Sequence, residues 1–131
     1  MSESNAGSDP YRFIFENIDS VPQLESLILL WNSRPVGWTE EDLASRLYIP
    51  QEQVPAVLRD LIRLQILQEI PGDTKRYSYL PRSEEQDELM RGIDRAYRSD
   101  LVRISTMIHS KASSPVREFA KAFRLKKDRE Q

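Results

Sequence analysis

The sequence contains no cysteine, one histidine and only four glycines in 131 residues. The missing cysteine excludes disulfides, thiolate zinc sites, iron–sulfur clusters and thiol catalysis. The single histidine excludes a histidine-rich metal site, and no two glycines have the spacing of a phosphate-binding loop. We therefore expect a protein without a metal ion, a cofactor or catalytic activity.

Long apolar segments are missing as well. No apolar run approaches the roughly 18 residues that cross a membrane. The first four residues lack the basic and apolar regions of a secretory signal. The length suits one domain. These features predict a small, soluble, cytoplasmic protein that does not contact membranes.

Charge is unevenly distributed, although the net charge is only −2. Residues 1–60 have four Lys/Arg and ten Asp/Glu, for a net charge of −6. Residues 61–131 have fifteen Lys/Arg and eleven Asp/Glu, for a net charge of +4. The asymmetry favours a charged contact surface, although a solvated face explains most charge runs.

The first part of the chain predicts an arm followed by two helices. Residues 1–10 are rich in Ser, Asn, Gly and Asp, which predicts a disordered arm. Residues 11–18 are too few for periodicity to distinguish a strand, a helical turn and an apolar hook. The N-cap residue Ser20 opens one predicted helix, which ends at Asn32, and Thr39 opens a second, short helix.

A third helix and a hairpin follow. The apolar spacing predicts a helix over residues 51–65, and Pro55 in its first two turns is expected to shorten or loosen its start. A Pro-Gly-Asp-Thr loop between two β-rich runs predicts a hairpin over residues 66–80. The expected core of this part comprises Leu27, Leu30, Trp31, Leu43, Leu47, Leu58, Leu61 and Ile62.

The last part of the chain is predicted to be helical. Apolar residues three or four apart predict one long helix from Ser83 to about Ser110, and Ser114 opens a last short helix. The long helix would span about 39 Å, so the rest of the domain covers only part of its apolar stripe. We therefore expect a dimer or partner interface made of Leu89, Ile93, Tyr97, Leu101, Ile104, Ile108, Val116, Phe119 and Phe123.

The order of elements in residues 23–80 resembles a winged-helix domain. The resemblance rests on Leu27 to Trp31 in the first helix, Thr39 to Leu47 in the second, Val54 to Leu67 in the third helix and the strand after it, and Arg76 to Pro81 in the returning strand. The helices beyond the hairpin are similar in layout to those of MarR-like bacterial transcriptional regulators, which dimerise through helices outside the wing.

The predicted fold is therefore mainly α. Residues 11–82 are expected to form a winged-helix domain of three helices and a β-hairpin wing. Residues 83–125 are expected to form a C-terminal helical extension for dimerisation or docking, and residues 126–131 a charged tail.

The resemblance implies that the second helix of the helix-turn-helix pair, here residues 51–65, enters the major groove of DNA. It also implies phosphate or minor-groove contacts by the wing, residues 71–76. Glutamine pairs with adenine, and arginine pairs with guanine or phosphate. The predicted DNA-contacting residues are Gln51, Gln53, Arg59, Arg63, Lys75, Arg76 and Arg82.

The leading hypothesis is a small, non-catalytic transcriptional regulator that binds double-stranded DNA as a homodimer. The alternative is a winged-helix protein–protein interaction module, an adaptor or regulator of a larger complex that does not bind DNA directly. The outer face of residues 51–65 distinguishes the two, because a basic face favours DNA and an acidic or apolar face favours protein. Glu52 and Asp60 place negative charge on this segment.

Overall fold

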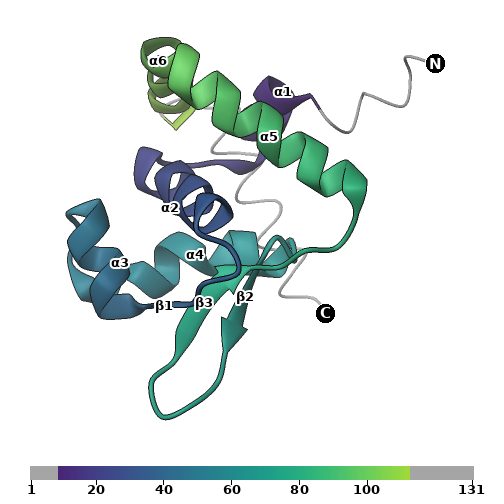
Figure 1. The fold of residues 1–131 in the computed structure, drawn as a ribbon. Coiled ribbons are helices and arrows are strands. Elements are labelled where there is room, and N and C mark those ends of the chain that lie inside the picture. The colour runs from purple at the N-terminus through teal and green to yellow at the C-terminus, as the bar shows by residue number, and fades with distance from the viewer. Residues whose placement is uncertain (1–8, 113–131) are drawn as a thin grey trace, which may run out of the picture.

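The computed structural model describes residues 9–112, which form a largely helical body with one small sheet (Figure 1). The elements in chain order are α1 (Pro10–Asn17), α2 (Val21–Asn32), β1 (Trp38–Thr39), α3 (Glu40–Leu47), the 3-10 helix η2 (Gln51–Gln53), α4 (Val54–Arg63), β2 (Leu67–Ile70), β3 (Arg76–Tyr79), α5 (Glu84–Ser99) and α6 (Leu101–Ala112). Helices α1, α5 and α6 lie at one end, α2 in the middle, and α3, α4 and the hairpin at the other end (Figure 1).

Helix α2 is the centre of the molecule. It contacts α3, α4 and β3 toward the hairpin end and α5 toward the other end. A helix that is buried on most of its faces requires cover on several sides. The ring of Trp31 meets the ring of Tyr79 edge-on, with centroids 5.0 Å apart. The buried residues of α2 are Gln23, Leu24, Ser26, Leu27, Ile28, Leu30 and Trp31.

Three helices begin where the sequence predicts a helix start. Ser20, Thr39 and Ser83 each accept a hydrogen bond from the backbone N–H three residues later, at 3.3, 3.0 and 3.1 Å. Each bond satisfies a backbone donor that has no partner within its helix. The predicted starts of α2 and α3 are therefore confirmed, as is the start of α5.

The sheet has three antiparallel strands in the order β1-β3-β2. The predicted hairpin is confirmed as β2 and β3, and Tyr77 of the central strand pairs with Trp38 on one side and Glu69 on the other. Both tyrosines of β3 are buried, Tyr77 with 1% and Tyr79 with 2% of their surface exposed. With α2, α3 and α4, the hairpin completes the predicted winged-helix fold.

The predicted helix over residues 51–65 differs from the structure at both ends. Residues Gln51–Gln53 form a 3-10 turn, and the α-helix begins at Val54. Pro55 has no backbone N–H, so it is tolerated only in the first turn of the α-helix, as the sequence led us to expect. Helix α4 ends at Arg63, and Gln65 adopts a left-handed conformation with φ 63°.

The predicted disordered arm over residues 1–10 is wrong at its last two residues. Asp9 caps α1 by accepting hydrogen bonds from the backbone N–H groups of Tyr11 and Arg12, at 3.1 and 3.3 Å. Pro10 then occupies the first helical position. Residues 11–18, whose conformation the sequence left open, are mostly this helix, which buries Ile14 completely. Residues 1–8 lie outside the described part of the chain.

The single long helix predicted from residue 83 to about residue 110 is two helices. Asp100 leaves helical geometry, with φ −142° and ψ 40°, although its N–H still bonds to the carbonyl of Ala96 at 2.8 Å. The Asp100 carboxylate accepts a hydrogen bond from the hydroxyl of Tyr11 at 3.1 Å. The break lets α6 turn, so that α1 packs against both α5 and α6. Apolar spacing continues across the break, which is why periodicity alone did not reveal it.

A buried lysine joins the first and last described helices. Lys111 of α6 is 4% exposed, and its Nζ donates to the backbone carbonyls of Ile14, at 2.6 Å, and Phe15. These carbonyls belong to the last turn of α1, where a cation is favoured by the helix dipole. Lys111 therefore fixes the orientation of α6 against α1.

Six of the eight predicted core residues are buried, and Leu47 and Ile62 are half-buried. Leu58 of α4 is 0% exposed, whereas Leu64 at the end of the same helix is 41% exposed. The two leucines therefore form a matched pair for testing the fold.

We expect Leu58→Ala to lower the free energy of unfolding by about 2–5 kcal/mol, because it leaves a cavity under α4. Leu64→Ala should change it by less than about 1 kcal/mol. Urea denaturation followed by circular dichroism measures both. Equal effects of the two substitutions would contradict the orientation of α4.

Candidate nucleic-acid interface

Helices α3 and α4 form the helix-turn-helix pair. Helix α3 ends at Leu47 and is capped by Tyr48, and residues Ile49 and Pro50 lead into η2. The backbone N–H groups of Tyr48 and Ile49 both bond to the carbonyl of Ala44, so the turn has a defined geometry. Helix α4 buries Val54, Leu58 and Leu61 against the core.

The opposite face of η2 and α4 is exposed. Gln51 and Gln53, two of the predicted DNA-contacting residues, are exposed in η2, ahead of the α-helix rather than in its first turn. Ala56 and Arg59 are exposed further along. Glutamine offers a donor and an acceptor in one plane, and arginine offers several donors. This face can therefore read base edges or hold phosphate.

Two of the predicted cations are paired with carboxylates. Arg63 forms an ion pair with Asp60 at 2.6 Å, one turn back on α4. Lys75 forms an ion pair with Glu69 at 3.1 Å across the base of the wing. A phosphate must compete with these carboxylates for both side chains. Within residues 9–112, the structure gives no such partner to Arg59.

The structure separates the remaining two predicted cations. Arg76 is exposed as the first residue of β3, opposite Ile70 and Thr39, and donates to the carbonyl of Gly37 at 3.4 Å. It lies where the wing leaves the sheet, behind the loop of residues 71–75. Arg82 is exposed in the link to α5, three residues beyond the opposite end of β3. Arg82 is therefore away from the wing tip.

Three tyrosine hydroxyls fix the wing and α5 to the rest of the molecule. Tyr77 donates to Glu40 at 2.9 Å, where α3 begins, and Tyr79 donates to Asp87 of α5 at 2.7 Å. Tyr97 of α5 donates to Glu25 of α2 at 2.8 Å.

Burial and the adjacent carboxylates raise the pKa of all three tyrosines, those of Tyr79 and Tyr97 to about 12. Because Tyr77 and Tyr79 are 1% and 2% exposed, their rings are packing groups of the wing and are not available for stacking on bases.

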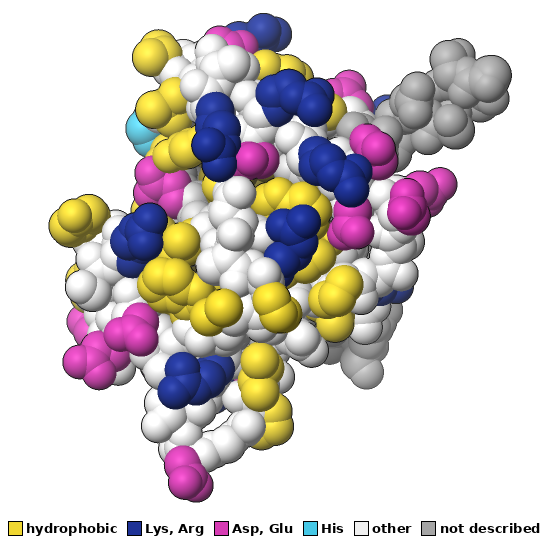
Figure 2. All heavy atoms as spheres, viewed as in Figure 1, with side chains coloured by type: hydrophobic (Ala, Val, Ile, Leu, Met, Phe, Trp, Pro, Cys, Tyr) yellow, Lys and Arg dark blue, Asp and Glu magenta, His cyan; other side chains and the backbone are white. Residues whose placement is uncertain are grey.

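Basic side chains do not gather into one patch on the face shown in Figure 2. Lys and Arg side chains are scattered over α5 and α6, and others lie over α3 and at the base of the wing (Figure 2). Apolar side chains gather over the middle of the molecule, and an acidic side chain marks the end of the wing (Figure 2). Glu41, Asp42 and Glu52 are exposed at the starts of α3 and η2. The candidate interface thus mixes both signs of charge.

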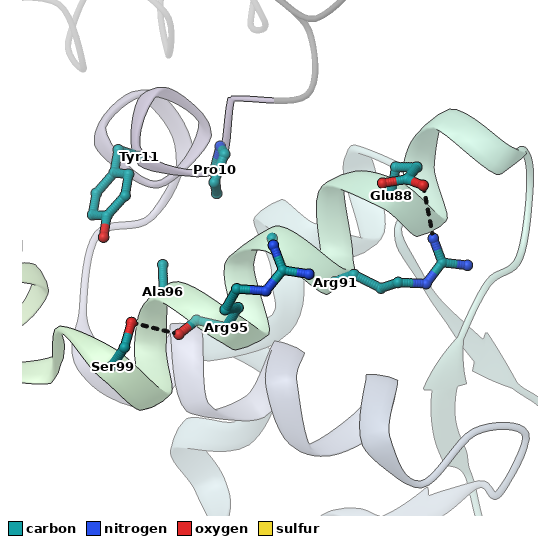
Figure 3. Close-up of a pocket in the computed structure, with 8 residues that line it drawn as sticks. Pro10, Tyr11, Glu88, Arg91, Arg95, Ala96 and Ser99 are labelled. Carbon is teal, nitrogen blue, oxygen red and sulfur yellow. Dashed lines mark hydrogen bonds and ion pairs between the residues drawn. The ribbon is translucent and has the colours of Figure 1, made fainter.

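A hollow of about 330 Å³ lies between α1 and α5, at the end of the molecule away from the wing (Figures 1 and 3). Pro10 and Tyr11 border it on one side and Arg91, Arg95 and Ser99 on the other (Figure 3). Arg91 is paired with Glu88 at 3.3 Å. Helix α5 approaches α1 closely here, since a Cβ on Gly92 would lie 3.2 Å from Pro10. The hollow is separate from the helix-turn-helix surface.

The predicted partner interface is largely covered within the chain. Ile93 and Ile108 are fully buried, Ile104 is 1% exposed and Leu89 is 7% exposed. The expectation that the rest of the domain covers only part of this stripe is wrong for these four residues, because α1 covers α5 and α6 and the sequence did not identify α1 as a helix. Tyr97 is half-buried, and Leu101 is 46% exposed. The other predicted residues, Val116, Phe119 and Phe123, lie outside the described residues.

Residues 9–112 contain no helix that is long and apolar enough to cross a membrane. The same residues hold no group of three or more His, Asp or Glu side chains placed to bind a metal ion.

Comparison with known proteins supports the fold through structure alone. No protein-family model and no curated protein matches the sequence. Among solved structures, the chain is similar to MepR from Staphylococcus aureus in a complex with DNA, at 19% identity and a TM-score of 0.51 over 99% of this chain and 92% of that one.

Two further structures agree. One is MepR described as a transcription regulator of the S. aureus multidrug efflux pump MepA, at 18% identity and a TM-score of 0.50, covering 95% and 88% of the two chains. The other is RV1404 from Mycobacterium tuberculosis, at 15% identity and a TM-score of 0.51, covering 92% and 82%. The chain therefore has a winged-helix fold with a MarR-like layout.

We expect the protein to lose stability as the pH rises from 10 toward 12. Tyrosines of the unfolded chain ionise near the ordinary pKa of 10.0, whereas Tyr79 and Tyr97 keep their protons in the folded state up to about pH 12. In this range the unfolded state binds fewer protons, so the free energy of unfolding falls as pH rises. Urea denaturation at several alkaline pH values measures the fall.

Tyr79→Phe is the control for this expectation, because it removes one raised pKa. The variant should be less stable than the unmodified chain at neutral pH, and its stability should fall less steeply above pH 10. An alkaline fall identical in the two proteins would contradict the role of the Tyr79–Asp87 hydrogen bond.

Proposed function

We propose that this protein is a DNA-binding transcriptional regulator that contacts duplex DNA through η2, α4 and the wing. The observation that carries the proposal is the exposed face of the second helix of the helix-turn-helix pair, where Gln51, Gln53 and Arg59 lie. The similarity to MepR solved in a complex with DNA, over almost the whole of both chains, supports it.

The residues divide into two roles. Gln51 and Gln53 precede α4 at the end that a recognition helix points into the major groove, so they are suited to read bases. Arg59, one to two turns further on, and Arg76 at the root of the wing are suited to hold phosphates. We leave Arg82 out of the proposed contact surface, because it follows the end of β3 that is farther from the wing loop.

The carboxylates of the interface weaken its attraction for DNA. Asp60 and Glu69 each neutralise one cation and repel phosphate. Release of either cation requires breaking an exposed ion pair, which costs less than about 1 kcal/mol. The proposed interface therefore binds DNA with moderate affinity. Arg59 and Arg76 contact phosphates without breaking an ion pair, whereas Arg63 and Lys75 must first leave Asp60 and Glu69.

The same ion pairs favour the second candidate function, a protein–protein interaction module. A surface of balanced charge, with Glu52 exposed between the two glutamines and Glu41 and Asp42 exposed at the start of α3, also suits a polar protein partner. The two candidate functions predict opposite effects of removing the interface carboxylates: binding to DNA would tighten, and binding to a polar protein partner would weaken.

We expect Arg59→Ala to weaken binding to duplex DNA and to reduce the slope of log K against log salt by about 1, because one phosphate contact is lost. Glu69→Gln should tighten binding, since it frees Lys75 and removes a negative charge. Gln53→Ala should change the preference among sequences rather than the salt slope. Fluorescence anisotropy with a labelled duplex, measured over a range of salt, records all three.

Glu88→Gln is the matched control, because Glu88 pairs with Arg91 on α5, away from the interface. It should leave DNA binding unchanged. Absence of duplex binding by the unmodified chain at low salt would reject the DNA proposal in favour of the protein-interaction module.

We also propose that the protein forms a homodimer through the exposed start of α6, together with the predicted apolar residues beyond residue 112. Leu101 and Val102 are 46% and 78% exposed, although both are apolar and adjacent. Large apolar side chains exposed together often mark a contact surface. Of the dimer interface predicted from the sequence, the proposal therefore keeps the exposed residue Leu101 and leaves out the residues that are buried within the chain.

We expect Val102→Glu to shift the protein from dimer to monomer without loss of helical structure, because residue 102 points to solvent in the single chain. Ile104→Glu, two residues later, should instead unfold the chain, since Ile104 is 1% exposed. Light scattering coupled to gel filtration measures the mass, and circular dichroism measures the fold. An unmodified chain that is monomeric at tens of micromolar would contradict the dimer.

A further inference from the structure

The turn between α3 and η2 holds an aromatic residue that packs against almost nothing. Tyr48 is 93% exposed, the largest exposed fraction among the large apolar and aromatic side chains that the structure describes. Its neighbours Leu47 and Ile49 turn inward and pack against the core. Burial of the ring is the main contribution that a tyrosine side chain makes to the stability of a fold. Tyr48 therefore contributes little to the packing of this chain.

The backbone of Tyr48 is also unfavourable for a tyrosine. It lies in the left-handed region, with φ 59° and ψ 44°, as the residue that ends α3. Glycine or asparagine usually occupies this position, because a Cβ atom crowds the carbonyl oxygen there. Hydrogen bonds from the N–H groups of residues 48 and 49 to Ala44 hold the conformation. Both the side chain and the backbone thus disfavour tyrosine for folding alone.

A residue retained against its backbone preference points to a function at that position. Tyr48 lies three residues before Gln51, on the turn that leads into the proposed reading face. In a docked helix-turn-helix pair, the first helix crosses the DNA backbone, so side chains of α3 and of the turn that follows it lie close to phosphates. A tyrosine hydroxyl donates well to a phosphate oxygen, and its ring can lie against the sugar. Arg46, exposed in the last turn of α3, adds positive charge nearby.

We propose that Tyr48 is a DNA-backbone contact that positions η2 and α4 in the major groove by donating its hydroxyl to a phosphate. This inference rests on the proposed function. Because the contact is made by an uncharged group, it releases no counterion of its own. It therefore adds affinity for all sequences without adding to the salt dependence of binding.

Three variants test the proposal in the full chain. Tyr48→Phe removes only the hydroxyl. Tyr48→Gly removes the side chain and relieves the left-handed backbone. Gln65→Gly is the matched control, because Gln65 is exposed, adopts φ 63° and follows the opposite end of α4. The probe is a fluorescein-labelled duplex of mixed sequence, about two helical turns long.

We expect Tyr48→Phe to weaken duplex binding by about 2- to 10-fold, the worth of one hydrogen bond, with an unchanged salt slope. Tyr48→Gly should weaken binding at least as much while raising Tm, so that stability and binding change in opposite directions. Gln65→Gly should raise Tm and leave binding unchanged. This combination would support the contact.

Binding by both Tyr48 variants that equals binding by the unmodified chain would overturn the role of Tyr48 while leaving the proposed function intact. A reduced salt slope in Tyr48→Phe would also overturn it, because the effect would then be a change in charge contacts. If the unmodified chain does not bind the duplex at low salt, the proposed function fails first, and the role of Tyr48 fails with it.

Discussion

The burial of α2 is the constraint on which the rest of the structure depends. This helix is apolar on most of its surface, so it is stable only when other elements cover it from several directions. Helices α3 and α4 and the sheet cover it toward one end of the molecule, and α5 covers it toward the other. Tyrosine–carboxylate hydrogen bonds join the same parts, from Tyr77 to Glu40, and from Tyr97 to Glu25. The helix-turn-helix pair is thereby held in a fixed position on a rigid centre.

One face of the helix-turn-helix pair does not pack against the rest of the molecule. The buried face of α4 is apolar, while its exposed face and η2 carry glutamines and arginine. The interface is not strongly basic, because carboxylates pair with two of its cations. The arrangement of α3, η2 and α4 therefore supports DNA recognition more strongly than the net charge of this surface does. A surface of this kind depends on accurate docking, so the uncharged contact that we propose for Tyr48 would matter more here than on a highly basic surface.

The sequence predicted most of the fold from local signals. Capping residues located the starts of α2 and α3, and apolar spacing located the start of α5. The Pro-Gly-Asp-Thr loop located the hairpin, and Pro55 indicated the altered start of α4. The sequence did not predict the break at Asp100, because the apolar spacing of α5 continues into α6. It also did not predict the role of α1, because eight aromatic-rich residues give no clear period. The candidate site was predicted by residue type, but the ion pairs, the position of Arg82 and the exposure of Tyr48 depend on tertiary structure.

The most direct test of the account is an NMR titration of the isotope-labelled full chain with a mixed-sequence duplex at low salt. The account predicts that the largest changes in backbone amide chemical shift lie in residues 48–59 and in the wing, residues 71–76, with much smaller changes along α5. Large changes confined to α5 and α6, or no changes in any amide, would contradict the claim that this helix-turn-helix surface binds DNA.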